Sequence, residues 1–192
     1  MSYIEDDFQR ELDAWDPARA RRIKPHKKLL RRDALVAALA LHAPTARRDT
    51  LALFDLYAAG ELPQNSFCDF CLGYTLVEDL GESMGRDLES SPASQDLGAA
   101  SVGLADDGCG MRYFVGREGA VHLLDLSEMP YRWQHLPDQP DYAFASVDIW
   151  CWALFQALLV DEGAVASEVL IERSQAKGCY SILRSTRFAE EW

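Results

Sequence analysis

Residues 98–126 read GAASVGLADDGCGMRYFVGREGAVHLLDL, and the predicted fold is built around them. It contains three short runs with strand character, which are Ser101–Ala105, Met111–Val115 and Ala120–Leu126. Breaks rich in glycine and aspartate separate the runs, and such breaks between β-branched and aromatic segments are typical of antiparallel hairpins. The stretch therefore predicts a three-stranded antiparallel meander, with one face covered by helices from both sides in sequence.

The middle run has the two-residue period of a strand. Met111, Tyr113 and Val115 fall on one face, whereas Arg112 and Phe114 fall on the other.

Helical patterns precede the meander. Ser2 and Glu5 have the spacing of a capping box at the start of a first helix. Asp16-Pro17 can start the next helix, which is amphipathic, carries a basic run and approaches Leu41. Another helix is expected over residues 46–59, with Gly60 as its C-terminal stop. A further helix is expected from Asn65 or Ser66 through Leu80. Residues 81–100 are rich in Gly, Ser and Asp and predict a surface loop.

The segment after the meander ends in a helix that is apolar on every side. Ser146 is placed to cap it, and it is expected to run from Val147 to about Val160. A helix without a polar face is buried, so this one is expected to lie against the meander. Residues 169–184 then alternate in a way that predicts a final hairpin. The fold class is therefore α+β, with N-terminal helices, a central antiparallel β-meander, a buried C-terminal helix and the final hairpin.

The charge of the chain is unevenly spread. The formal net charge is −12 over 192 residues. Residues 1–48 carry 11 Lys and Arg against 7 Asp and Glu, whereas residues 49–192 carry 8 against 24. We expect a basic N-terminal helical extension, residues 1–42, followed by an acidic α+β domain, residues 43–192. An acidic field attracts basic partners and repels nucleic acid, although acidity also serves solubility alone.

The sequence predicts a cytoplasmic protein that makes no membrane contact. The N-terminus MSYIEDDF has no apolar signal segment. The longest apolar run, Ile149–Val160, is too short to span a bilayer. The five cysteines are odd in number and are expected to be reduced thiols.

Cys68 and Cys71 form the sharpest local motif. On a helix, two thiols three residues apart share a face, which suits a redox pair or half of a zinc site. The sequence offers no second pair of ligands at short spacing, so we favour buried, inert thiols. A thiol-based redox or zinc-binding protein remains the alternative to the function favoured below.

The sequence shows no constellation of catalytic residues. His122 and Asp125 are three residues apart on one expected strand, so their side chains point to opposite faces and cannot form a dyad. The sequence also lacks the common nucleotide-binding, hydrolase and metalloprotease motifs. We therefore expect a protein that is not an enzyme and needs no cofactor or metal ion.

Carboxylates mixed with aromatic side chains are the best candidates for partner binding. Aromatic anchors ringed by acidic groups suit an interface with a basic protein. The alternative is that the aromatic residues only cover the edge of the sheet, and the sequence leaves both open. The candidate residues are Asp106, Asp107, Glu128, Tyr131, Trp133, Asp138 and Asp141.

A basic run from Arg19 to Arg32 raises the possibility of nucleic-acid binding. It contains eight Lys and Arg residues interleaved with aliphatic ones, but no aromatic side chain that could stack on bases. We favour a solvated basic face that packs on the acidic body.

The order of these features resembles the SUKH superfamily, which comprises bacterial immunity proteins related to a fungal cell-wall-synthesis regulator. Residues 43–63 resemble its opening helix, which ends here in DLYAAGELP. VGLADDGCGMRYFV, residues 102–115, is similar to its glycine-rich strand, and GREGAVHLLDL, residues 116–126, to the strand that follows. AFASVDIWCWALFQALL, residues 143–159, is similar to its closing helix. Ala58-Ala59 stand where the family has Asn-Gly, and both ends of the chain are unmatched.

The resemblance implies a partner and a mode of action. Members of this superfamily bind and neutralise a cognate secreted toxin, which is often a nuclease. It implies no catalytic residues for this chain. Because nucleases have basic clefts, an acidic inhibitor is physically reasonable, and electrostatic steering would make its association fast.

Overall fold

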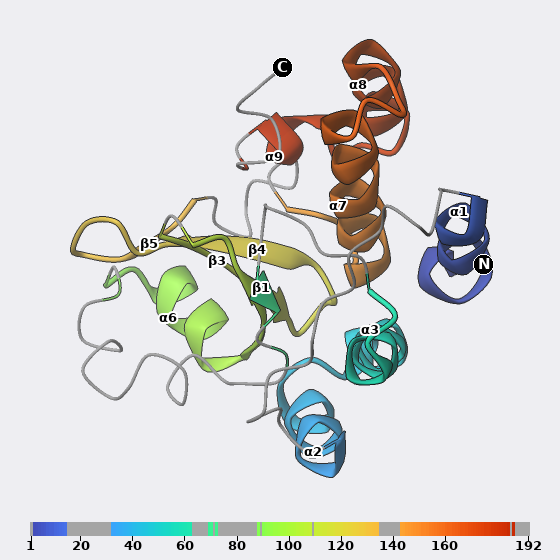
Figure 1. Ribbon diagram of the computed structural model, residues 1–192. Coiled ribbons are helices and arrows are strands. Elements are labelled where there is room, and N and C mark those ends of the chain that lie inside the picture. The colour runs from blue at the N-terminus through green and yellow to red at the C-terminus, as the bar shows by residue number, and fades with distance from the viewer. Residues whose placement is uncertain are drawn as a thin grey trace.

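The computed structural model describes residues 2–14, 32–62, 69–70, 72, 88, 90–108, 110–134, 143–184 and 186. These residues form an α+β fold in which helices lie against an antiparallel sheet (Figure 1). The fold class predicted from the sequence is confirmed, with one part of it corrected below.

The sheet contains five strands in the order β1-β2-β3-β4-β5, so each strand pairs with its neighbour in sequence. Its centre is the predicted meander, formed by β2 (Ser101–Asp106), β3 (Met111–Gly116) and β4 (Val121–Asp125). Two-residue strands flank it, β1 (Asp69–Phe70) and β5 (Arg132–Trp133). The register of β2 against β3 shifts between Gly103 and Ala105, whereas β3 and β4 pair without interruption.

The two faces of the sheet belong to different hydrophobic clusters. Tyr113 and Val115 belong to the main cluster with α7 (Val147–Asp161), whereas Phe114 and Leu124 belong to a smaller one with Leu97 of α6 (Pro92–Ala99). The alternation read from the sequence of β3 is therefore confirmed. Both faces of the meander are covered, whereas the sequence predicted cover for one.

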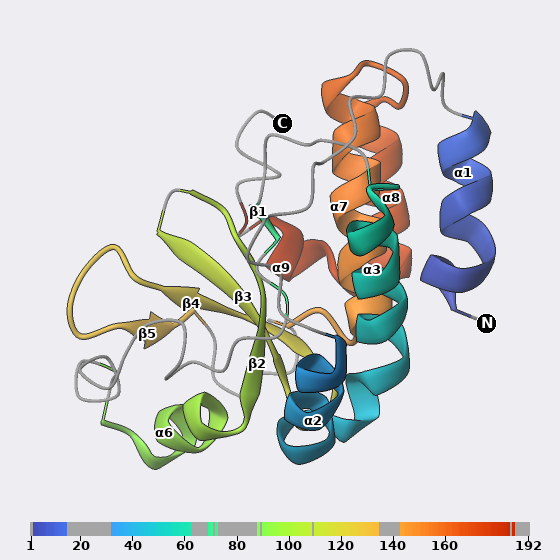
Figure 2. The ribbon, with the colours of Figure 1, turned by 60° about the horizontal axis from the view of Figure 1, so that its bottom comes forward.

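The main cluster is built around α7 (Val147–Asp161), which neighbours α3 (Arg47–Ala59) and α8 (Ser167–Ala176) (Figures 1 and 2). The Ser146 hydroxyl accepts a hydrogen bond from the backbone N–H of Ile149 at 3.1 Å, as predicted for the cap. The Trp150 side chain is fully buried. Helix α2 (Arg32–His42) packs on α3 and on β2, and the short helix η2 (Pro44–Ala46) connects α2 to α3.

The N-terminal segment is fastened to α7 by Asp148. It consists of a π-helical turn, η1 (Tyr3–Asp7), and α1 (Phe8–Ala14). The Asp148 carboxylate accepts hydrogen bonds from the N–H groups of Tyr3 and Ile4, both at 2.8 Å, and from the Ser2 hydroxyl at 3.0 Å. The predicted capping box is therefore wrong, because the Ser2 hydroxyl bonds to α7 and not to its own helix.

The N-terminal segment and α2 contribute to the main cluster. Tyr3, Ile4, Phe8, Leu35 and Leu39 are all buried in it. The boundary expected between residues 42 and 43 stays a prediction, and these contacts show that the described residues on its two sides share a core.

The final hairpin is wrong, because residues 167–184 form α8 and α9 (Tyr180–Arg184). The strand-like alternation over residues 169–173 overlaps with a four-residue spacing of buried side chains. That spacing is helical, and it determines the structure of the segment. Leu170 and Ser174 are fully buried on the face of α8 toward the core, whereas Arg173 is exposed. Gly178, with φ of 69°, separates the two helices.

The helix expected from residue 65 or 66 to residue 80 is contradicted where the chain is described. Asp69 and Phe70 pair antiparallel with Asp106 and Ala105 of β2. The Phe70 ring packs edge-on against Trp150 and tilted against Tyr57, so tertiary packing overrides the local pattern.

The loop expected over residues 81–100 contains a helix, α6 (Pro92–Ala99), which lies apart from α7 and covers the other face of the sheet (Figure 2). The Ser91 hydroxyl caps it by accepting from the Ser94 N–H at 3.3 Å, and Pro92 occupies the first helical position. Both are sequence signals for a helix start. The Gly- and Ser-rich composition of the stretch obscured them.

Candidate interaction surface

The turn between β2 and β3 and the segment that follows β4 meet at one end of the sheet. The backbone N–H of Leu126 donates to the carbonyl of Gly110 at 2.7 Å, and Gly110 also lies against Ser127. The turn between β2 and β3 therefore lies beside the segment that leaves β4. We call the described residues of 106–111 together with 125–132 the turn-end surface.

Asp106 and Asp107 stabilise their own turn. An Asp106 oxygen accepts from the Arg112 guanidinium at 2.6 Å, and the other accepts from the Gly108 N–H at 2.6 Å. Asp107 is buried, and its carboxylate accepts from the Met111 N–H at 2.8 Å. These two carboxylates shape the turn-end surface, and both already accept hydrogen bonds from the turn or from the strand beside it.

Glu128 and Met129 are exposed side chains of the turn-end surface, and together they offer a partner a negative charge and an apolar group. Met129 is 70% exposed, which is unusual for a large apolar side chain. Glu128 is exposed beside it, and the peptide bond from Met129 to Pro130 is cis. Methionine is flexible and polarisable, and it adapts to apolar partners of different shapes.

The Trp133 side chain is buried, so the expectation that it anchors a partner is corrected. Its indole N–H donates to the carbonyl of Ser94 at 3.1 Å, and its ring packs edge-on against Phe114. Tyr131 is half-buried and packs against the same cluster. The sheet-edge alternative therefore describes Trp133, which holds α6 onto the sheet.

Replacing Trp133 by phenylalanine is expected to lower the free energy of unfolding by about 1–2 kcal/mol, because the indole hydrogen bond and part of the ring volume are lost. Urea denaturation followed by circular dichroism measures this loss. Partner binding by the folded variant is expected to be unchanged. If the folded variant no longer bound the partner, Trp133 would be a binding residue after all.

Several predicted sites lie outside the described residues. They are Asp138, Asp141, Cys68, Cys71 and the basic run from Arg19 to residue 31. The described residues between the two cysteines, Asp69 and Phe70, form a strand and not the expected helix. The thiol or zinc alternative stays a prediction that metal analysis and thiol titration would test.

His122 is a buried, neutral histidine that the sequence had singled out only to exclude a dyad. Burial lowers the pKa of its imidazole to about 4, although the nearby Glu118 carboxylate acts in the opposite direction. Its Nδ1 is buried without a hydrogen-bond partner. The ring lies edge-on to Trp133, with 6.3 Å between the ring centroids. His122 is thus part of the packing under α6.

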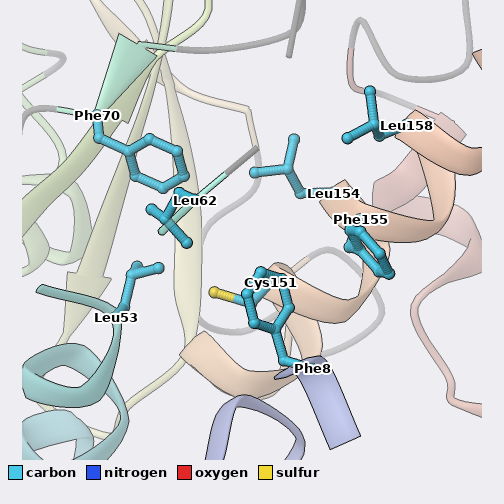
Figure 3. A pocket seen from close by; sticks show the side chains of 8 residues that line it. All are labelled: Phe8, Leu53, Leu62, Phe70, Cys151, Leu154, Phe155 and Leu158. Carbon is cyan, nitrogen blue, oxygen red and sulfur yellow. The ribbon is translucent and has the colours of Figure 1, made fainter. Parts of the chain in front are cut away.

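An apolar cavity lies between α1, α3 and α7 (Figure 3). Its volume is about 30 Å³, and Phe8, Leu53 and Leu154 are among its lining residues. The Cys151 sulfur points into it (Figure 3). The cavity is too small for an organic ligand, and its apolar lining offers water few hydrogen-bond partners. It is therefore a packing defect of the core.

Within the described part of the chain, no three His, Cys, Asp or Glu side chains are grouped so that they could hold a metal ion. In the same residues, no helix has the length and apolar character needed to cross a membrane. Compared with models of protein families, with curated proteins and with solved structures, the chain matches none of them.

Proposed function

We propose that this chain is a non-enzymatic immunity protein. It binds a cognate secreted toxin, of the polymorphic, contact-dependent or type VI kind, and neutralises it by covering a basic active-site cleft. The proposal takes the partner class from the resemblance to the SUKH superfamily and the charge of the partner from the acidity of residues 49–192. It includes no binding to nucleic acid or membrane.

The turn-end surface is the observation that carries the proposal. An exposed Met129 beside the exposed carboxylate of Glu128 combines an apolar contact with negative charge, in a segment whose first residue, Leu126, donates a backbone hydrogen bond to Gly110. Protein interfaces pair such apolar centres with polar rims. Because the hydrogen bond of Leu126 positions the start of this segment before binding, less conformational entropy is lost when a partner docks.

Charge reversal at Glu128 is expected to weaken partner binding about tenfold, mainly through a slower association rate, and the effect should be larger at low salt. Glu128 is the residue of choice because reversal at Asp106 or Asp107 would disrupt the turn itself. Surface plasmon resonance at two salt concentrations measures the change.

Glu172→Lys is the matched control for Glu128→Lys. Glu172 is an exposed glutamate of α8, and its reversal changes the net charge by the same amount. If both variants weakened binding equally, the overall charge and not the turn-end surface would govern association.

The immunity function itself requires a growth experiment. Tagged protein is used to capture a partner from its native lysate, and the partner is identified by mass and cloned. Expressed alone, this partner is expected to arrest bacterial growth, and co-expression of the chain is expected to restore it. A stoichiometric partner without any effect on growth would contradict the proposal.

A further inference from the structure

A groove of about 530 Å³ lies between α6 and the turn that joins β3 to β4. This is at the end of the meander opposite the turn-end surface, because the β3–β4 turn and the β2–β3 turn leave β3 in opposite directions. A volume of this size is in the range of sites that bind small molecules or a partner's side chain.

Both walls of the groove are fixed. On one side, the Thr45 hydroxyl donates to the carbonyl of Arg117 at 2.7 Å, and Gly119 packs so closely on Thr45 that a Cβ would lie 3.0 Å from its hydroxyl oxygen. On the other side, Trp133 holds α6 through the Ser94 carbonyl. The groove is therefore formed before any ligand arrives.

The charges of the groove favour a cation. Asp96 of α6 and Glu118 of the turn are exposed on opposite walls, and neither forms an ion pair with a described residue. The groove also receives the C-terminal end of α6, where the helix carries partial negative charge. Among the described residues that line the groove, Arg117 is the one cation, and the neutral His122 beneath Gly116 adds no positive charge.

The remaining lining of the groove is apolar and small. Leu97 and the three alanines at positions 93, 99 and 100 offer a surface without polar side chains. Lysine and arginine bury their methylene stems on such surfaces and keep the charged head in a polar setting. The groove thus matches both parts of a basic side chain.

We propose that this groove binds a lysine or arginine side chain of a protein partner, with the stem on Leu97 and the cation between Asp96 and Glu118. The groove proposal rests on the proposed function, in which the partner is a basic protein, and it specifies one of the contacts. It adds a second contact at the opposite end of the sheet from Glu128. The two contacts together would bind a partner along the length of the meander.

The proposal is tested with a peptide probe and the full-length chain. Acetyl-Gly-Lys-Gly-amide is titrated into ¹⁵N-labelled protein, and shifts are expected at residues 96–100 and 117–118. The norleucine analogue, which keeps the stem and lacks the charge, is expected to cause none. Asp96→Asn with Glu118→Gln is expected to weaken binding at least tenfold, and Arg117→Gln is expected to strengthen it severalfold by removing the competing cation.

Three results would overturn the groove assignment. They are equal binding of the norleucine peptide, shifts that persist in the doubly neutralised variant, and weaker binding by Arg117→Gln. None of these involves the toxin or Glu128. Failure of the groove therefore leaves the proposed function standing, and failure of the growth experiment leaves the groove as a site for basic peptides in general.

Discussion

Replacing Asp148 by alanine is expected to lower the free energy of unfolding by about 3 kcal/mol at pH 7. Its carboxylate accepts the N–H groups of Tyr3 and Ile4 and the Ser2 hydroxyl, and hydrogen bonds to charged groups are the strong ones. Alanine would leave the two N–H groups of the first turn of η1 without their acceptor. Urea denaturation measures the loss.

Two further variants separate this role from a general effect on α7. Asp148→Asn keeps one carbonyl oxygen and removes the negative charge beside Asp49, whose pKa is raised by burial and then by Asp148. Its loss is expected to be smaller, about 1 kcal/mol. Asp161→Ala, at the exposed end of the same helix, is expected to change stability by less than about 0.5 kcal/mol. If Asp148→Ala and Asp161→Ala lowered the free energy of unfolding equally, the hydrogen bonds from residues 2–4 to Asp148 would make no specific contribution to stability.

Acidification is expected to remove about 3 kcal/mol of stability through His122 alone. The pKa of its imidazole falls from 6.5 in the unfolded chain to about 4 in the folded protein, and each unit corresponds to about 1.4 kcal/mol. Between these two values the unfolded chain binds the extra proton, so stability is full above pH 6.5 and is lost as the pH falls toward 4. Stability measured by urea denaturation from pH 7.5 to 4 reports the loss.

His122→Gln provides the comparison, because glutamine is uncharged at every pH. Asp49 works against His122, since a raised carboxyl pKa favours the folded state as the pH falls. The difference between wild type and variant cancels this contribution. A difference that did not change with pH would show that His122 is charged or accessible in the folded protein. Direct NMR titration of its imidazole then decides between the two.

The sequence was informative where local pattern and tertiary context agree. The meander and α7 follow from alternation, from Asp-Gly breaks and from an apolar helix that has a cap. Local pattern failed over residues 169–184, where strand-like alternation hid the four-residue spacing of Leu170 and Ser174. It failed again at Phe70, whose strand exists because its ring packs against Trp150. Contacts between residues so far apart in the sequence cannot be read from the pattern of neighbouring residues.

The candidate surface was predictable only in part. Composition pointed to the turn of Asp106 and Asp107 and to the segment of Glu128, and the structure joins the two. Composition could not distinguish an exposed carboxylate, such as Glu128, from a buried one that accepts a hydrogen bond within its own turn, such as Asp107. The groove between Asp96 and Glu118 had no sequence signal, because its walls are brought together by the placement of α6.

The fastening of the N-terminal segment has a consequence for how the chain matures during translation. The three hydrogen bonds to Asp148 join residues 144, 145 and 146 positions apart. Whereas each hairpin of the meander can close as soon as its own residues leave the ribosome, the hydrogen bonds of residues 2–4 to Asp148 cannot form until α7 has emerged. Until then Tyr3, Ile4 and Phe8 lack the α7 side of the cluster that buries them, and the nascent chain presents an incompletely covered apolar segment.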